Sequence, residues 1–196
     1  IGWDEDRNAT DPKYIQGQEP DSFEMPDRDV NLYAIWRANN STKYTVEHYT
    51  VASDGTAKLY SSEGFTGTTD TTATAEPIEI PGYTFDEDHD GSVPSGTITG
   101  DGKLVLKLYY TADADELAYD ANTGAGEMDP TEGYVGEPVT IAGNGFSKPG
   151  YTFTGWNTAA DGSGTGYSAG SEYTLTAGED VLYAQWSADT NTKYTV

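Results

Sequence analysis

The sequence of 196 residues contains no cysteine, so no disulfide bond can stabilise the protein. No apolar run is long enough to cross a bilayer, and we therefore expect no direct insertion into a membrane. Strong helix formers are also few, because Thr, Gly, Tyr and Asp dominate the composition. These features predict a β-rich protein with many turns.

Basic residues are scarce as well. Ten Lys and Arg residues stand against 33 Asp and Glu residues, which gives a net charge of −23. A charge of this sign repels the phosphate backbone of nucleic acids and the surface of anionic lipids. We therefore expect no nucleic-acid partner. Strong acidity keeps an array of modules soluble and offers carboxylates to cations.

Residues suited to catalysis are sparse. The only histidines are His48 and His89, and they are not accompanied by a nucleophile motif, a Gly-rich phosphate loop or a metal-binding pair of histidines. His48 lies in a predicted strand, where we interpret it as a packing or surface residue. The sequence therefore predicts a protein that is not an enzyme and has no cofactor, except for the calcium alternative considered below.

An internal repeat dominates what is present. Residues 150–186 begin with GYTFTGW and end with LYAQW, and residues 2–36 begin with GW and end with LYAIW. The two Gly-Trp pairs lie 153 residues apart, whereas the closing Trp36 and Trp186 lie 150 apart. The motif TKYTV follows each closing Trp after a short linker, at residues 42–46 and 192–196. Self-similarity at such a period is typical of tandem-repeat proteins, so we expect a piece of a longer array.

The repeat boundaries divide the chain into small modules. Each complete module has about 70 residues, a size that buries a limited fraction of its surface. We predict the following parts: the C-terminal part of a module (1–37), a linker (38–42), a second module (43–111), a complete third module (115–186), and a linker with the first strand of the next module (187–196).

Alternating apolar residues predict the strands. In residues 103–111, Leu104, Leu106, Leu108 and Tyr110 share one face, which is the period of a half-buried strand. Residues 53–55, Ser-Asp-Gly, predict a hairpin turn. Weak helical turns are an alternative to irregular structure or strand in residues 64–75 and 137–143. The expected fold class is therefore mostly β, in the α+β sense.

Four tryptophans occupy fixed places in the repeated strand motifs: Trp3, Trp36, Trp156 and Trp186. A large ring in such a place most often fills a small core, and we predict that role. A platform on which sugars stack is the alternative. Tyr49, Tyr109 and Tyr183 are predicted to be exposed on strand faces and are better candidates for contact with a glycan or protein ligand.

An acidic loop has the spacing of a calcium site. In the segment DEDHDG, Asp86, Asp88 and Asp90 alternate before Gly91, and alternate carboxylates at such a turn converge on a hard cation. Thr97 stands where an EF-hand loop needs a bidentate Glu, so an EF-hand is not expected. The two readings left open are a weaker calcium site and a solvated acidic loop.

The third module resembles the Listeria–Bacteroides repeat, the B-repeat family of internalin type. The resemblance covers residues 117–186 and, in part, 2–36. It rests on the Asp120–Asn122 turn, the GYTFTGW run and the closing YAQW. Thr123 departs from the pattern, because the family more often has Asn-Gly-Gly at this turn.

Residues 43–111 resemble the mucin-binding-protein (MucBP) family. The opening YTVEHY, the Asp54-Gly55 turn, the PGY at 81–83 and the final LKLYYT carry this resemblance. The two resemblances imply tandem small β-grasp-like (ubiquitin-like) modules in an elongated array. They also imply the surface of Gram-positive or related cells, with roles as adhesins or as the stalks that carry them.

The expected function is therefore mechanical. We expect an extracellular tandem-repeat segment of a bacterial cell-surface protein, attached to the cell wall or assembled into a fibre, that acts as an adhesin stalk or a structural repeat. The alternative is a module that binds glycan or mucin. The expected partners are neighbouring copies of the same repeat protein or surface glycoproteins of a host. We expect residues 1–37, whose opening strands are missing, to pair with a neighbouring copy.

Overall fold

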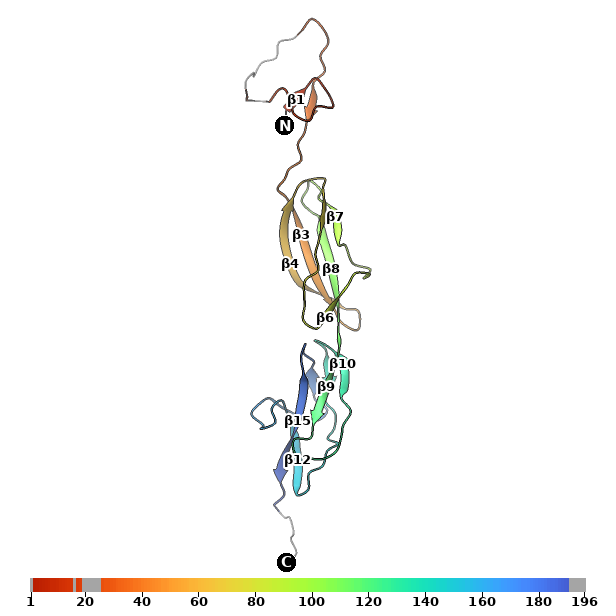
Figure 1. Ribbon diagram of the computed structural model, residues 1–196, viewed down its shortest axis with the longest axis vertical. Helices are drawn as coiled ribbons and strands as arrows, with labels where there is room; N and C mark the ends of the chain where they lie inside the picture. Colours follow the sequence, from red (N-terminus) through yellow and green to blue (C-terminus); the bar gives the residue numbers. More distant parts are fainter. Residues whose placement is uncertain (1, 16, 19–25, 191–196) are drawn as a thin grey trace, which may run out of the picture. The chain divides into compact units, whose positions relative to one another are not determined.

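The structure is a computed structural model that describes residues 2–15, 17–18 and 26–190 (Figure 1). The strand expected at residues 192–196 and part of the 1–37 segment lie outside these residues. All regular elements of the described residues are strands, which confirms the mostly-β prediction. The helical component of that prediction is wrong for the described residues, because segments 64–75 and 137–143 form the end of a strand (to Gly67), short strands (Thr72–Thr74 and Pro138–Thr140) and irregular structure instead. The same residues contain no helix that could cross a membrane.

By its internal contacts the chain divides into two compact units. The first comprises residues 1–45, 64–73 and 95–104, and the second comprises 46–63, 74–94 and 105–196. The predicted module at 43–111 contributes residues to both units, and the predicted module at 115–186 lies wholly in the second.

The front of the chain forms a two-stranded antiparallel sheet of β1 (Gly2–Asp4) and β2 (Tyr33–Ile35). Trp3 on β1 pairs with Ala34 on β2. On its opposite edge, β1 forms an isolated bridge from Trp3 to Tyr14. Glu5 fastens this hairpin, because its carboxylate accepts hydrogen bonds from Lys13 at 3.0 Å and Arg28 at 2.9 Å. Arg37 and Asp11 form a second ion pair here.

The middle of the chain forms a four-stranded sheet and a two-stranded sheet (Figure 1). The predicted turn at residues 53–55 is confirmed, since Gly55 has a φ of 84° and Asp54 accepts a hydrogen bond from Thr56 N–H. The larger sheet has the order β4 (Ala57–Gly67), β3 (Thr42–Val51), β8 (Val105–Ala112) and β6 (Tyr83–Asp86), and the smaller one joins β5 (Thr72–Thr74) to β7 (Ser95–Thr97).

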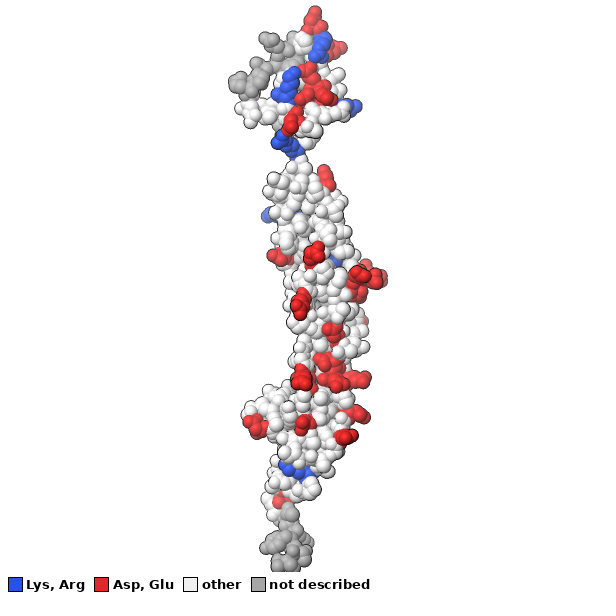
Figure 2. Space-filling model, in the orientation of Figure 1, with Lys and Arg blue, Asp and Glu red and all other residues white. Residues whose placement is uncertain are grey.

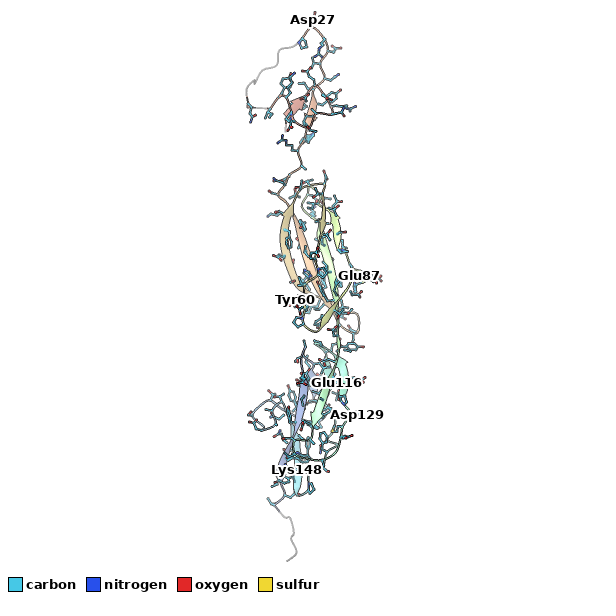
Figure 3. The ribbon with its side chains drawn as sticks, in the orientation of Figure 1. Asp27, Tyr60, Glu87, Glu116, Asp129 and Lys148 are labelled. Atoms are coloured by element: carbon cyan, nitrogen blue, oxygen red, sulfur yellow. The ribbon has the colours of Figure 1, made fainter. Side chains whose placement is uncertain are left out.

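The two outer strands of the larger sheet differ in length and exposure. β4 is an edge strand of 11 residues, and nearly all of its side chains are exposed. They include Leu59, Tyr60 (Figure 3) and Phe65. The core lies against β8 instead, where Leu106, Leu108 and Tyr110 are buried as the alternation predicts.

The third module consists of a five-stranded mixed sheet and a two-stranded sheet, whose strands β11 and β14 come between those of the large sheet in the sequence. β9 pairs with β15 in parallel, and the other strand pairs of the module's described residues are antiparallel. The large sheet has the order β10 (Thr131–Tyr134), β9 (Ala114–Asp120), β15 (Asp180–Ala188), β12 (Tyr151–Asn157) and β13 (Gly166–Tyr167); the small sheet pairs β11 (Pro138–Thr140) with β14 (Glu172–Thr174).

The core of this module is built around Trp156. Its side chain is 1% exposed, its Nε1–H donates to the Ala142 carbonyl at 3.1 Å, and it contacts the rings of Tyr119, Phe146 and Phe153. The other buried members of this core are Leu117, Val139, Ile141, Leu175, Leu182 and Ala184.

The four predicted core tryptophans have different outcomes. The prediction is confirmed for Trp156, and Trp186 packs against the same core while its Nε1–H donates to Ala121 O at 2.9 Å. It is wrong for Trp3 and Trp36, which are 49% and 72% exposed. The physical reason is that, among the described residues, no strand pairs with the outer edge of β2 and no second layer packs on the hairpin.

The sequence repeat is also a repeat of strand register. Trp156 lies opposite Ala184 between β12 and β15, and Trp3 lies opposite Ala34 between β1 and β2. On the other edge, Trp156 lies opposite Tyr167, as Trp3 lies opposite Tyr14. The front hairpin therefore reproduces the β13–β12–β15 part of the third module.

Asp120 and Asn122 stabilise the turn after β9 through their side-chain hydrogen bonds. Asp120 accepts a hydrogen bond from Asn122 N–H at 2.7 Å, and Asn122 Nδ2 donates to Ala184 O at 2.9 Å. Asn122 and Thr123 both have positive φ values, of 45° and 70°. A β-branched residue is strained in this region, so Thr123 stores strain at this turn.

We predict that Asp180→Ala destabilises the third module by about 2–3 kcal/mol, because the buried carboxylate accepts three hydrogen bonds that the variant loses. The Asp180 side chain is only 5% exposed and accepts hydrogen bonds from Tyr173 Oη, Thr176 N–H and Thr176 Oγ1. Urea unfolding followed by circular dichroism measures the change. The matched control is Asp129→Ala, at an exposed carboxylate (Figure 3). An equal effect of both variants would contradict the role of Asp180.

We also predict that the front hairpin loses stability in acid. Hydrogen bonds from Lys13, Arg28 and Tyr14 lower the pKa of Glu5 from 4.5 to about 2. A carboxylate whose pKa is lower in the folded state stabilises it above pH 4.5, and this contribution is lost as the pH falls toward about 2.

Hydrogen exchange of the Trp3 and Tyr14 amides, which donate to each other's carbonyls, measures this loss. Glu5→Gln should remove the acid-dependent part, whereas the exposed Glu87→Gln should leave it unchanged. Identical pH dependence in the wild type and Glu5→Gln would refute the assignment.

Candidate functional site

Three rings from three segments stack on the middle sheet. Tyr49 lies on β3, Tyr109 on β8 and His89 on the turn after β6. The Tyr109 ring lies 4.9 Å from Tyr49 and 4.0 Å from His89, centroid to centroid, with interplanar angles of 14° and 10°. This stack buries Tyr109 on the face of β8 that the alternation left for solvent.

The backbone of the turn holds His89 in the stack. Gly91 N–H donates to His89 Nδ1 at 3.0 Å, and Ser92 N–H donates to the His89 carbonyl at 2.8 Å. Gly91 itself lies against Tyr109, because a Cβ at this position would be 2.8 Å from Tyr109 Cζ. A residue without a side chain is therefore required for the ring to sit this close.

Charged groups border the stack on the Tyr49 side. Lys107 Nζ lies 5.7 Å from the centroid of the Tyr49 ring, within the range of a cation–π contact. Tyr49 Oη donates to Glu47 at 2.6 Å, and this hydrogen bond raises the pKa of Tyr49 to about 12. The site thus combines an aromatic surface, a cation and a carboxylate.

The structure brings together two of the three predicted ligand-binding tyrosines. Tyr49 and Tyr109 are in contact, whereas Tyr183 lies on β15 of the third module, opposite Asn157. The expected exposure is wrong for Tyr109, which is only 9% exposed because it packs against the other two rings. Binding of a ligand by these residues remains a prediction.

The predicted calcium site is not assembled. Among the described residues, no group of three or more His, Asp or Glu side chains could hold a metal ion. Asp86 Oδ1 instead accepts a hydrogen bond from Asp88 N–H at 3.2 Å, which closes a local turn. The turns that follow direct His89 onto Tyr109, so Asp86, Asp88 and Asp90 do not converge. Glu87, in the same turn, lies at the edge of the sheet in Figure 3.

His48 is part of a buried polar network. The Tyr110 hydroxyl accepts a hydrogen bond from Ile78 N–H at 3.0 Å, so its own proton is available for His48 Nδ1 at 2.8 Å. Burial lowers the pKa of His48 and raises the pKa of Tyr110. Both shifts favour neutral side chains, which fits a packing role and confirms the interpretation of His48.

Within the second unit, the middle module contacts the third module directly. Ser53 N–H and Oγ both donate to the Glu137 carboxylate at 2.6 Å. A Cβ on Gly82 would lie 2.5 Å from Val135 Cγ1, so these backbones approach closely. Tyr83 Oη donates to the Val135 carbonyl at 3.4 Å. This contact ties the β3–β4 turn and the start of β6 to the turn after β10.

Two hollows in the second unit, one of about 520 Å³ and another of about 690 Å³, are open to solvent. Residues that line the first include Lys58, Leu59, Tyr60, Tyr83 and Glu137, and residues that line the second include Asp115, Glu116, Glu132 and Tyr134.

The sequence did not predict the roles of His89 and Gly91 in the aromatic stack, or of Glu137 in the contact between the modules. His89 was placed among carboxylates, and neither Gly91 nor Glu137 was linked to a distant residue. Ser53 and Glu137 are 84 residues apart, and no local pattern connects them. For Gly91, the signal was available in part, because a glycine that ends an acidic turn often marks a close approach.

Comparison with known proteins identifies the third module. Residues 116–185 match the family model of the Listeria-Bacteroides repeat domain. This match confirms the resemblance stated for residues 117–186. It does not extend to residues 43–111, whose resemblance to the MucBP family remains a prediction.

Two longer proteins of Evansella cellulosilytica are similar to the chain. One, named "Putative membrane protein", is 30% identical over 164 residues, which are 82% of this chain and 24% of that protein. The other, named "Putative Gly-rich membrane protein", is 26% identical over 188 residues, which are 94% of this chain and 21% of that protein. The chain thus spans less than a quarter of the length of either relative.

We predict that Gly91→Ala breaks the aromatic stack and costs about 1–3 kcal/mol, because a methyl group would overlap the Tyr109 ring. The ring-current shifts of the His89 imidazole protons, measured by NMR, should move toward random-coil values. Gly64→Ala is the matched control, since nothing lies within 4 Å of a Cβ there. Unchanged His89 shifts in Gly91→Ala would show that the stack does not depend on this glycine.

Proposed function

We propose that the chain is a non-enzymatic, tandem-repeat segment of a bacterial cell-surface protein, acting as an adhesin stalk or a fibre-forming structural repeat. The observation that carries this proposal is the repeated register, in which Trp3 faces Ala34 as Trp156 faces Ala184. A unit that recurs with its strand pairing intact is suited to building length by addition of copies.

The proposed modules are small and β-grasp-like, arranged in an elongated array. In the third module, the first and last strands, β9 and β15, pair in parallel, and each has an antiparallel neighbour on its other side. This order, β10-β9-β15-β12, supports a β-grasp-like sheet in which β11 and β14 take the place of the helix. The middle module is proposed to be MucBP-like.

The contact between the middle and third modules supports a spacer role. The hydrogen bonds of Ser53 to Glu137 and the close approach of Gly82 to Val135 restrict the rotation of one module against the other. A stalk needs such restriction, because a freely jointed chain coils and loses reach. The short linker at 38–42 acts in the same direction.

An extracellular location at the cell surface fits the charge and the relatives. Carboxylates are spread along the visible face of the second unit (Figure 2), which keeps neighbouring copies soluble. Both relatives carry names that describe them as membrane proteins. We propose that an anchor elsewhere in a longer protein holds this segment outside the cell, attached to the cell wall or assembled into a fibre.

The alternative function is binding of a glycan or mucin by the middle module. The stack of Tyr49, Tyr109 and His89 with Lys107 nearby favours it, because aromatic faces and polar groups together recognise sugars. The burial of Tyr109 weighs against it, since the stacked rings cover one another.

We predict that the longest dimension of the protein, measured by small-angle X-ray scattering, grows in proportion to the number of copies when one, two and three 150-residue periods are joined. Flexibly joined modules would instead grow as roughly the square root of the copy number. Glu137→Ala should lower the growth toward that value, whereas the exposed Glu127→Ala should not. Square-root growth in the unmodified protein would contradict the spacer role.

A glycan and mucin array separates the two functions. The spacer proposal expects no specific binding by the chain. Specific binding that Tyr49→Ala abolishes, with the fold retained by circular dichroism, would establish the alternative in its place.

A further inference from the structure

The chain enters and leaves the third module on strands that lie side by side. β9 is the first strand of the module and β15 is its last, and they pair in parallel from Leu117 with Asp180 to Asp120 with Tyr183 (Figure 1). Because both strands run in the same direction, the start of β9 and the end of β15 lie at opposite ends of the ladder. Tension applied at these two points therefore slides one strand along the other and loads the four residue pairs of the ladder together.

The middle module has the same arrangement. Its first strand, β3, and its last strand, β8, are neighbours in the four-stranded sheet. Near the start of β3, Thr45 N–H donates to the Leu104 carbonyl at 3.0 Å. Farther along β3, the Tyr49 ring stacks on Tyr109. In both contacts the partner lies about 60 positions later in the sequence. A constant separation means that the two strands run in parallel, so tension on this module also loads its terminal strands in shear.

A single residue connects the two strand pairs. Only Asp113 lies between the end of β8 and the start of β9. Its N–H donates to the Gly82 carbonyl at 2.9 Å, and its carbonyl accepts a hydrogen bond from Val135 N–H at 3.0 Å. Thr84 Oγ1 donates to its carboxylate at 2.6 Å. Because this connection has no slack, tension in β8 passes directly to β9.

Side chains add contacts across the pair of β3 with β8. Tyr49 on β3 and Tyr109 on β8 have ring centroids 4.9 Å apart, and Lys107 on β8 lies over the Tyr49 ring. His48 on β3 and the hydroxyl of Tyr110 on β8 share a hydrogen bond of 2.8 Å. Sliding of one strand along the other disrupts all of these contacts together. The aromatic stack therefore has a role that requires no ligand.

Two side-chain hydrogen bonds extend the connection between β9 and β15. Asn122 Nδ2 donates to Ala184 O at 2.9 Å. Trp186 Nε1–H donates to Ala121 O at the same distance. Both bonds join the segment that follows β9 to the part of β15 beyond the last pair of the ladder. The two strands are thus held together over a longer stretch than their backbone register alone provides.

We propose that both modules carry tension, with the β3–β8 and β9–β15 pairs acting in series as clamps loaded in shear, and that the stack of Tyr49 on Tyr109 strengthens the first clamp. The inference rests on the proposed stalk role, in which a surface segment transmits force between its two ends, and it adds the path of that force. A ladder loaded in shear fails only when its hydrogen bonds break together, whereas a ladder pulled open from one end loses them one at a time.

Single-molecule force spectroscopy tests the direction of loading in the third module. The sequence has no cysteine, so two introduced cysteines define both attachment points in the full chain. Ala114→Cys with Ala188→Cys attaches the start of β9 and the end of β15, which loads the ladder in shear. Ala114→Cys with Glu179→Cys is the matched control, because both points then lie at the same end of the ladder. All three side chains are exposed.

We expect the shear attachment to unfold the module at about two to four times the force of the control attachment, because four residue pairs share the load instead of one. Forced unfolding follows the unfolding rate, so both attachments are compared at one pulling speed. Equal forces for the two attachments would overturn the clamp.

The role of the stack is tested on the middle module, attached through Ser41→Cys and Ala114→Cys. Tyr49→Ala should lower the unfolding force about 1.5-fold, because a stacked ring across the loaded pair is lost. Tyr60→Ala should leave the force unchanged, since it removes a ring from the edge strand β4, outside that pair. Attachment through Ser41→Cys and Lys103→Cys opens the pair from its start, and there Tyr49→Ala should also leave the force unchanged.

A lower force for Tyr49→Ala in both attachments would indicate a general loss of stability and would overturn the role of the stack. Circular dichroism establishes that each variant is folded before it is pulled. Neither test depends on the scattering measurement, which reports the reach of the protein without load. A stalk that is extended but mechanically weak would therefore contradict this inference and leave the proposed spacer role intact.

Discussion

The pairing of a tryptophan-bearing strand with an alanine-bearing strand is the constraint on which the third module depends. Trp156 lies opposite Ala184, which is 0% exposed, so the large ring meets a small partner across the sheet. The Trp156 ring then packs against the edge of the Phe146 ring in the core of the module. In a cysteine-free module of about 70 residues, one large buried ring supplies a considerable part of the apolar area that holds the fold.

The same constraint explains why the front hairpin keeps its register although Trp3 is 49% exposed there. Trp3 and Ala34 pair through the backbone, and the ion pairs of Glu5 with Lys13 and Arg28 hold the loop between them. Backbone pairing is local to the hairpin, whereas burial of the ring needs elements from farther along a repeat. Register and core are therefore separable in this architecture.

Features with a local cause could be predicted from the sequence. The alternation in residues 103–111 placed Leu106, Leu108 and Tyr110 in the core, and Asp54 and Gly55 defined the hairpin turn. The module boundaries are predicted from the repeat, and residues 116–185 match one family model. The strand order could not be read, because the parallel pairing of β9 with β15 joins residues about 63 positions apart, as in Asp180 with Leu117.

The candidate site was harder to predict, since spacing does not report where side chains point. Asp86, Asp88 and Asp90 had the spacing of calcium ligands, yet the turn they form serves to place His89 on Tyr109. Tyr109 was expected in solvent for the same reason: the segment that covers it comes from a different part of the chain. At Thr123 only the backbone shows that a branched residue stands at a φ of 70°.

The exposed edge of β4 has a consequence for behaviour in bulk. An edge strand of 11 residues with Leu59, Tyr60 and Phe65 exposed is a template for cross-chain β-aggregation. Long-range repulsion between chains of charge −23 keeps such edges apart in dilute salt. Colloidal stability of this protein thus depends on an electrostatic barrier that added electrolyte screens, and precipitation at high ionic strength would begin at this strand.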